Sequence, residues 1–320
     1  MKILKKEVLE IIKRYDLGKL ISYKIIKGGL VNYNYILKTD KGEYITRIVG
    51  NTNKQKFKQI ELQFKIIKYL KKNKFPYFMP EPLESSDSKK IITFGIKRVW
   101  LYKLIKGSNR IRPSLNEMKQ MAKALATYHY LVKNLKGDII KDESKKRIIE
   151  GFEKMSHIKI KNNTDKYALR YRDFLFEVFK KYENFEISIN KLFVHADFDS
   201  TNVLFHKGKL TAVIDFDEMF YAPRVFDVSI SLRDSCCTRG KLDFSKAHDF
   251  LKEYEKVNKL SKIEKEAIIP IILIANIDFF IWAYLSMKKE PENRIKYMKE
   301  MVLLTKDIVE NKNIDRLFKK

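Results

Sequence analysis

The chain has 320 residues and carries 66 Lys and Arg against 40 Asp and Glu, a formal charge of +26. This length exceeds the usual core of one domain, so two lobes are expected. The charge would suit nucleic acid or an anionic membrane, but the lysines are spread along the whole chain, so no specific nucleic-acid partner is expected.

The first hundred residues follow strand and helix patterns in turn. A short amphipathic helix is expected first, then three strands; these segments cover 3–15, 20–27, 31–38 and 44–49. Gly28-Gly29 forms the turn between the first two strands. A glycine turn lets backbone N–H groups approach phosphates closely, which makes both glycines candidate nucleotide contacts.

Two charged residues stand out in the next elements. Arg47 lies in the third expected strand, and its guanidinium fork suits phosphate oxygens. Glu61 is the only acid of an expected helix over 54–72, at the margin of its apolar stripe. Two further strands are expected at 91–94 and 97–104.

The remainder of the chain is mostly helical in pattern. Ser114 and Glu117 form a capping box that opens one long helix. The most apolar segment, 267–287, contains Pro270, Asn276 and Asp278, so a buried pair of helices is expected in place of a membrane span. The N-terminus has no long apolar signal region, and the only cysteines, Cys236 and Cys237, are adjacent. Adjacent cysteines suit neither a disulfide framework nor a zinc site, so a cytoplasmic location is expected.

The stretch from 191 to 216, KLFVHADFDSTNVLFHKGKLTAVIDF, carries the chemistry. Apolar strands end in polar residues: Asp197 follows one strand, Asn202 begins a hairpin that turns at Lys207-Gly208, and a strand ending in Ile214-Asp215-Phe216 closes it. Four residues separate Asp197 from Asn202. In phosphoryl transfer one carboxylate accepts the proton of the attacking hydroxyl, while an amide oxygen and a second carboxylate hold Mg²⁺. The spacing therefore predicts Asp197 as the catalytic base and Asn202 and Asp215 as metal ligands.

These residues, in the run HADFDSTNVLF–AVIDFDEMFYAPRVFDVSISL, resemble the aminoglycoside phosphotransferase/choline kinase superfamily, nearest to its homoserine-kinase-like and choline-kinase-like branches. The resemblance implies an α+β, two-lobed protein-kinase-like fold. A nucleotide-binding lobe would span 1–98, a hinge 99–107 and a catalytic lobe 108–320, with ATP and Mg²⁺ as cofactors.

The resemblance also implies roles for residues outside the motif. The carbonyl of Lys103 and the N–H of Ile105 would bind adenine at the hinge. Glu61 would pair with Arg47, as a helix glutamate pairs with the third-strand basic residue in kinases. Asp227 would cap its helix or accept hydrogen bonds from the catalytic loop, and His129 is expected to be a packed core histidine.

The acceptor is expected to be a small hydroxyl compound carrying an ammonium group, such as an amino alcohol or hydroxy amino acid. On strand geometry Asp217 shares the face of Asp215, so Asp217 and Glu218 are the candidate substrate residues. Trp282 and Tyr284 could add aromatic faces, although a core position fits their apolar segment better. Aminoglycosides or sugars remain alternative acceptors.

Two rival functions remain. A protein kinase is disfavoured because only 11 residues separate Asp215 from Asp227, too few for an activation loop. A non-catalytic kinase-like protein that binds nucleic acid or a membrane surface is disfavoured because all three catalytic polar groups are present. The sequence does not indicate an oligomeric state.

Overall fold

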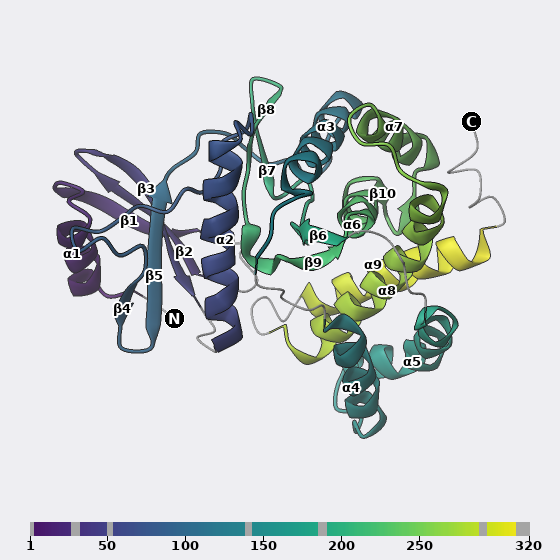
Figure 1. Ribbon diagram of the computed structural model, residues 1–320. Helices are drawn as coiled ribbons and strands as arrows, with labels where there is room; N and C mark the ends of the chain where they lie inside the picture. The colour runs from purple at the N-terminus through teal and green to yellow at the C-terminus, as the bar shows by residue number, and fades with distance from the viewer. Residues whose placement is uncertain are drawn as a thin grey trace.

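The computed structural model describes residues 3–26, 33–49, 54–137, 143–184, 191–287 and 293–311. An antiparallel sheet with two helices forms the N-terminal lobe, and a mostly helical lobe follows it (Figure 1). The predicted two-lobed α+β class is confirmed. The predicted lobe boundaries stay a prediction.

The N-terminal sheet has five antiparallel strands in the order β1-β2-β3-β5-β4. Their bounds are Leu20–Ile26 (β1), Tyr33–Thr39 (β2), Gly42–Val49 (β3), Ile92–Phe94 (β4) and Lys97–Lys103 (β5). Helix α1 (Lys5–Arg14) packs on one face and α2 (Lys54–Lys72) on the other. Because side chains alternate along a strand, β3 directs Ile45, Arg47 and Val49 toward α2.

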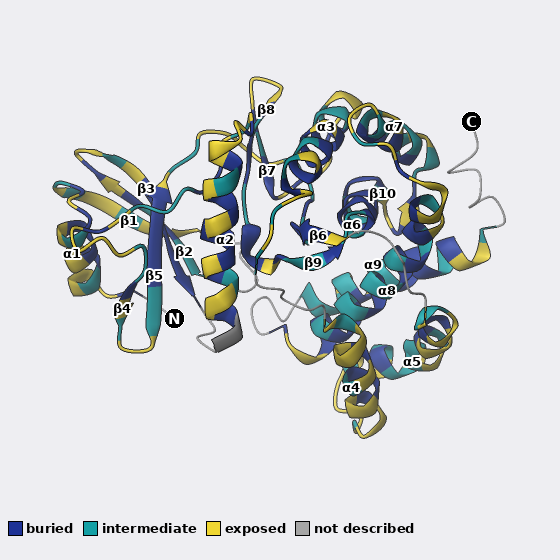
Figure 2. Ribbon diagram, viewed as in Figure 1, coloured by how far each residue is buried: buried dark blue, intermediate teal, exposed yellow. Residues whose placement is uncertain are grey.

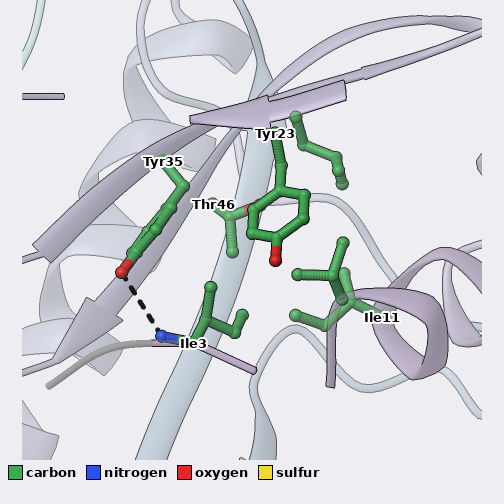
Figure 3. A pocket seen from close by; sticks show the side chains of 7 residues that line it. Ile3, Ile11, Tyr23, Tyr35 and Thr46 are labelled. Carbon is green, nitrogen blue, oxygen red and sulfur yellow. Dashed lines mark hydrogen bonds between the residues drawn. The ribbon is translucent and has the colours of Figure 1, made fainter. Parts of the chain in front are cut away.

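The face of the sheet toward α1 encloses a small cavity (≈ 10 Å³) lined by residues such as Ile11, Tyr23 and Thr46 (Figure 3). The backbone N–H of Ile3 donates to the Tyr35 hydroxyl across it at 3.3 Å. A space of this size holds one water at most. It also lies on the opposite side of the sheet from Arg47, so it is no substrate site.

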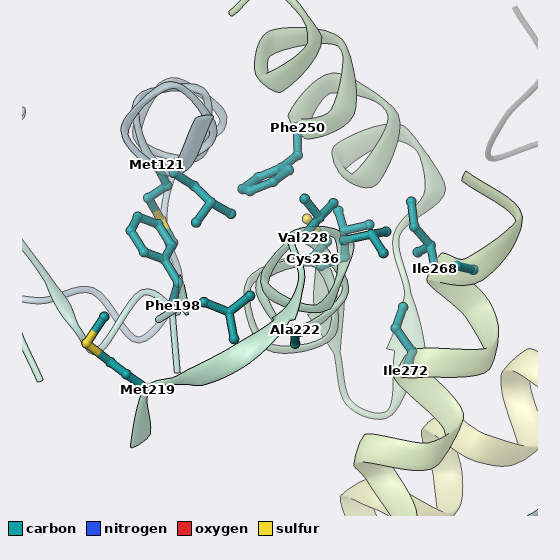
Figure 4. Close-up of a cluster of buried hydrophobic side chains, with 14 of the residues drawn as sticks. Met121, Phe198, Met219, Ala222, Val228, Cys236, Phe250, Ile268 and Ile272 are labelled. Atoms are coloured by element: carbon teal, nitrogen blue, oxygen red, sulfur yellow. The ribbon is translucent and has the colours of Figure 1, made fainter. Parts of the chain in front are cut away.

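The C-terminal lobe packs seven helices around one large apolar core, part of which is drawn in Figure 4. The helices, within the described residues, are α3 (Leu115–Val132), α4 (Ser144–Ser156), α5 (Asn163–Tyr182), α6 (Val225–Ser235), α7 (Phe244–Glu255), α8 (Lys262–Leu285) and α9 (Arg294–Glu310). Short strands lie between α5 and α7: β6 (Lys191–Val194), β7 (Val203–His206), β8 (Lys209–Val213), β9 (Phe220–Pro223), β10 (Cys237–Thr238) and β11 (Lys241–Leu242). Helix α6 is buried along most of its length near the centre of this lobe (Figure 2).

The expectation of two helices in segment 267–287 is wrong, because α8 is one continuous helix that contains Pro270. By length and composition alone α8 could cross a membrane. It contacts α4, α5, α6 and α9, and its polar Asn276 is fully buried, with its Nδ2 3.4 Å from the Thr305 hydroxyl. A buried polar residue with a hydrogen-bond partner favours a helix of the protein core over a membrane span, as the sequence analysis expected.

The hairpin β7–β8 forms as predicted, with its turn at Lys207-Gly208. Two segments, one between α2 and β4 and one between β5 and α3, bind it through backbone hydrogen bonds. After α2, Phe78 pairs with β8, donating to the Thr211 carbonyl at 2.8 Å and accepting from the Val213 N–H at 3.0 Å. After β5, Ser108 exchanges two bonds with Phe205 of β7, at 2.9 and 3.0 Å. The hairpin is therefore attached to both segments.

Candidate active site

The loop after β6 is held by one buried carboxylate. Asp227 accepts the backbone N–H of His195 and that of Ala196, each at 2.7 Å, and the Nε2–H of His129 at 2.9 Å. Ala196 has a φ of 68°, a conformation that costs free energy for a residue with a Cβ. The three bonds to Asp227 hold this conformation and fix the backbone just before Asp197.

Asp227 thus binds the catalytic-loop backbone, as the resemblance implied. Its alternative role as a helix N-cap is wrong, because the N-cap of α6 is Arg224 and Asp227 lies inside the helix. His129 is a fully buried histidine whose Nδ1 accepts from the Tyr254 hydroxyl at 2.7 Å. Burial lowers the pKa of His129. A neutral ring with the proton on Nε2 satisfies both contacts.

Asp197 and Asn202 lie together, as their spacing predicts. The Asn202 side-chain amide donates to the Asp197 carboxylate at 2.7 Å and to the Asp197 carbonyl at 2.9 Å. Burial raises the pKa of Asp197 well above its ordinary value, and the carboxylates of Asp199 and Asp215 add to the effect. Because the Asn202 Nδ2 makes both bonds, its oxygen is the amide atom left to coordinate a cation.

Asp215 is reached through a sharp change in backbone direction. Strand β8 ends at Val213, and Asp215 has φ 61° and ψ 58°, in the left-handed region that Asp tolerates better than most residues. A 3₁₀ turn, η1 (Phe216–Glu218), follows. The expected strand through Phe216 is therefore wrong. His195 binds the two motifs together, since its Nε2 donates to the Ile214 carbonyl at 3.0 Å.

Arg47 reaches this turn from the N-terminal sheet. Its Nη2 lies 2.6 Å from Asp215 Oδ1 and 2.6 Å from Asp217 Oδ2. Burial alone would raise the pKa of Asp215, but the guanidinium outweighs it and the pKa is lowered. The expected partner Glu61 is exposed on α2, so the assignment of Glu61 to Arg47 is wrong. Helix phase is the reason, because Ile60 and Phe64 pack against the sheet and Glu61 turns away.

Helix α2 contributes a cation to this turn instead. The Lys56 ammonium donates to the Asp217 carbonyl and to Glu218 Oε1, each at 3.1 Å. The sequence analysis missed Lys56, although it lies four residues before Ile60 on the apolar stripe, where a lysine is unexpected. Asp217 is therefore buried and bound by two cations of the N-terminal lobe, which contradicts its expected role as a substrate residue. Glu218 has a side chain that is 52% exposed, and its expected role stays a prediction.

A different group of charges lies beside Asp197. Asp199 accepts from the N–H and hydroxyl of Thr201, each at 2.6 Å, and from the Asn202 N–H at 3.1 Å. Burial, followed by the Asp234 carboxylate, raises the pKa of Asp199 to about 6. Asp234 is held by two bonds from Arg233, at 2.6 and 2.7 Å.

Aromatic rings lie next to these charges. The Arg233 guanidinium is 5.8 Å from the centre of the Phe279 ring, and Trp282 stacks on Phe279 at 5.4 Å. Tyr284 is core, donating its hydroxyl to Asp165 at 2.8 Å. The sequence analysis did not select Arg233 and Asp234. An Arg-Asp pair inside the apolar run VSISLRDSCC was the available signal.

Only some of the predicted nucleotide contacts lie within the described residues. Gly28 and Gly29 lie outside the described residues. Lys103 ends β5 opposite Tyr44, and the Leu104 N–H donates to the Glu43 carbonyl at 2.9 Å. Among the described residues the N–H of Ile105 has no hydrogen-bond partner. An adenine edge could use it, and the roles of Lys103 and Ile105 stay predictions.

The donor set at Asn202 and Asp215 fits a hard cation such as Mg²⁺. Both residues offer oxygens, the Asp215 side chain is 34% exposed, and only its Oδ1 is bound by Arg47. Within the described ranges no three His, Cys, Asp or Glu side chains converge to hold a metal. A cation here would therefore need further oxygens from phosphate and water, as Mg²⁺ commonly does in nucleotide sites.

A family model described as "Phosphotransferase enzyme family" matches residues 22–257, which is most of the chain. The chain belongs to this family. It is an enzyme that transfers a phosphoryl group to a hydroxyl group of a small molecule. The resemblance stated from the HAD, NVLF and IDF motifs is thereby confirmed.

Similar proteins extend the match over nearly the whole chain. A homoserine kinase of Polaromonas naphthalenivorans (strain CJ2) is 22% identical over 280 residues, 81% of this chain and 80% of that protein. The structure of an amicoumacin kinase in complex with AMP-PNP, Ca²⁺ and Ami superposes with a TM-score of 0.69, 17% sequence identity and 93% coverage of both chains. The structure of a microcompartment-associated aminopropanol kinase superposes with a TM-score of 0.67 and 13% sequence identity, covering 92% of this chain and 93% of that chain. These superpositions confirm the protein-kinase-like fold.

Proposed function

We propose that this enzyme uses ATP and Mg²⁺ to phosphorylate the hydroxyl of a small acceptor that also carries an ammonium group, an amino alcohol or a hydroxy amino acid. The observation that carries this proposal is the grouping of Asp197 with Asn202 and with the carboxylates of Asp199, Asp215 and Asp234. The relatives named homoserine kinase and aminopropanol kinase support an acceptor of this kind.

The chain's own residues divide the work as follows. Asp197 accepts the hydrogen bond of the acceptor hydroxyl and takes its proton, which orients the oxygen for attack on the γ-phosphate. Asn202 holds Asp197 through its amide and presents its oxygen to Mg²⁺, together with Asp215. Mg²⁺ would neutralise charge on the phosphates.

The charges around Asp197 favour a cationic acceptor. Asp197, Asp199 and Asp234 bring three carboxylates together, and among the residues that the structure describes only Asp234 forms an ion pair with an arginine. Burial, followed by repulsion from neighbouring carboxylates, makes the charged forms of Asp197 and Asp199 costly. An ammonium group bound at Asp199 would relieve that repulsion and place the neighbouring hydroxyl of a small amino alcohol near Asp197. A neutral sugar carries no ammonium group and would not relieve this repulsion.

The test is an ATP-consumption screen with homoserine, choline, ethanolamine, aminopropanol, neutral sugars and aminoglycosides, each compared by kcat/KM. We expect amino alcohols or hydroxy amino acids to be preferred over neutral sugars. Asp199→Asn should reduce this preference by roughly tenfold. The control is Asp173→Asn, which removes the same charge from an exposed position on α5. A preference for neutral sugars, or equal effects of both substitutions, would refute the acceptor class. Preference for aminoglycosides would support the larger cationic alternative.

A further inference from the structure

The charges that join the two lobes differ from the predicted pair in the position of the anion, which lies on the turn after β8 and not on α2. The predicted pair had its cation on the sheet and its anion on α2. In the structure the sheet and α2 both supply cations, Arg47 and Lys56, and the turn after β8 supplies the anions. Within the described residues, α2 presents no carboxylate to Arg47, since Glu61 is exposed.

The two carboxylates on Arg47 differ sharply in burial. Arg47 and Asp217 are each 5% exposed, whereas the Asp215 side chain is 34% exposed. Separating a fully buried ion pair leaves an uncompensated charge in the interior and is strongly unfavourable. A partly exposed carboxylate can exchange its partner for water or a metal ion at much lower cost. Asp217 is therefore the permanent partner of Arg47, and Asp215 is the exchangeable one.

The backbone of the turn is tied to α2 at the same place. Lys56 is 9% exposed and donates to the carbonyl of Asp217 itself, as well as to Glu218. This bond restrains the position of Asp217 from the helix side while Arg47 binds it from the sheet side. The Arg47 Nε–H is buried without a hydrogen-bond partner in the described part of the chain, so the guanidinium retains donor capacity beyond its two carboxylates.

We propose that Asp217 is a positioning residue, which takes over the part of a helix glutamate by holding Arg47 in place to bind nucleotide phosphates. Arg47 already contacts Asp215 at 2.6 Å, and if a metal ion took that carboxylate, the bond to Asp217 would still hold the guanidinium in place. The proposal rests on the proposed ATP-dependent function. It assigns Asp217 neither a metal-binding nor an acceptor-binding role.

The experiment is a calorimetric titration of ATP, with EDTA and separately with Mg²⁺, into wild type, Asp217→Asn, Arg47→Gln and the double variant. We expect Asp217→Asn to weaken ATP binding by roughly tenfold both with and without Mg²⁺, because the substitution acts through the position of Arg47. In the Arg47→Gln background the same substitution should have almost no effect on affinity. Glu61→Gln, which removes an exposed charge from α2, is the control and should leave both affinities unchanged.

Each alternative role gives a different result. If Asp217 binds a metal, its substitution weakens only the Mg²⁺ titration and does so in either background, which overturns the proposal. If Asp217 is merely structural, its substitution lowers the melting temperature while the affinities stay unchanged, which also overturns it. Asp217→Glu keeps the carboxylate and should restore at least part of the affinity, so it tests the idea even if Asp217→Asn folds poorly.

Failure of the proposed function is separately visible. A folded wild-type protein that binds no ATP under either condition refutes both proposals. A wild type that binds ATP, with Asp217 and Arg47 substitutions that are strictly additive, refutes the positioning role alone.

Discussion

Asp227→Asn is the substitution whose effect follows most directly from the geometry. The Asp227 carboxylate is fully buried and accepts three hydrogen bonds, two on Oδ2 and one on Oδ1. An asparagine of the same shape has one acceptor oxygen and one NH₂ group. If its oxygen takes the Oδ2 position, its NH₂ group faces the N–H of Ala196, and two donors then oppose each other.

The magnitude can be worked from these contacts. Losing one hydrogen bond to a charged group costs about 1.5–3 kcal/mol, and leaving the partner N–H buried and unpaired costs a similar amount again. The other two bonds also weaken when the charge is removed. We therefore expect a loss of about 3–4 kcal/mol, a large part of the 5–15 kcal/mol typical of a folded domain.

Urea unfolding followed by tryptophan fluorescence measures this loss. Asp243→Asn is the matched control, because Asp243 also accepts a backbone N–H, from Lys246 at 3.1 Å, but as a helix N-cap with a 39% exposed side chain. Asparagine caps helices as well as aspartate, so the control should change stability by less than about 0.5 kcal/mol. A loss below about 1 kcal/mol for Asp227→Asn would refute the reasoning. Because Ala196 precedes Asp197, kcat should fall further than ATP affinity.

Asp197→Asn should keep the fold and ATP binding but lower kcat by roughly 10²–10⁴-fold, and near-wild-type turnover would contradict its role as the base. Asp215→Ala should weaken MgATP more than Asn202→Ala in calorimetry, because a carboxylate neutralises the ion while an amide only coordinates it; equal affinities would contradict this. Burial alone would raise the pKa of Glu264, but its bonds from Arg224, at 2.6 and 3.0 Å, outweigh it and the pKa is lowered. The stabilisation by Glu264 is therefore present above the unfolded-chain pKa of about 4.3 and is lost as pH falls through the lower folded value. Glu264→Gln should lower stability at pH 7 by about 2 kcal/mol and flatten the acid limb of the stability curve, and an unchanged acid limb would contradict this.

The sequence predicted the parts of the site that depend on local patterns. Strand alternation and the Lys207-Gly208 turn determine the hairpin, and a fixed spacing brings Asn202 to Asp197. The left-handed conformation of Asp215 and the 3₁₀ turn after it have no such local signal, because tertiary contacts with Arg47 and His195 hold them.

Errors arose where a role depended on the phase of a helix or on contacts between lobes. Glu61 lies at the margin of an apolar stripe, where one residue of phase decides between burial and solvent. Asp217 was assigned to the acceptor because strand alternation gave it the face of Asp215. It does lie near Asp215, but both carboxylates bind Arg47, a residue 170 positions away from Asp217 in the chain. Contacts at that sequence separation leave no local pattern.

The double attachment of hairpin β7–β8 limits how it can move. Phe78, in the segment between α2 and β4, and Ser108, in the segment that leads from β5 into the C-terminal lobe, are each bonded to a different strand of the hairpin. Attachment on both strands restrains the hairpin against sliding and twisting relative to the two segments that it binds. Asn202 directly precedes β7 and Asp215 follows β8 by two residues, so both predicted metal ligands are anchored to this restrained hairpin.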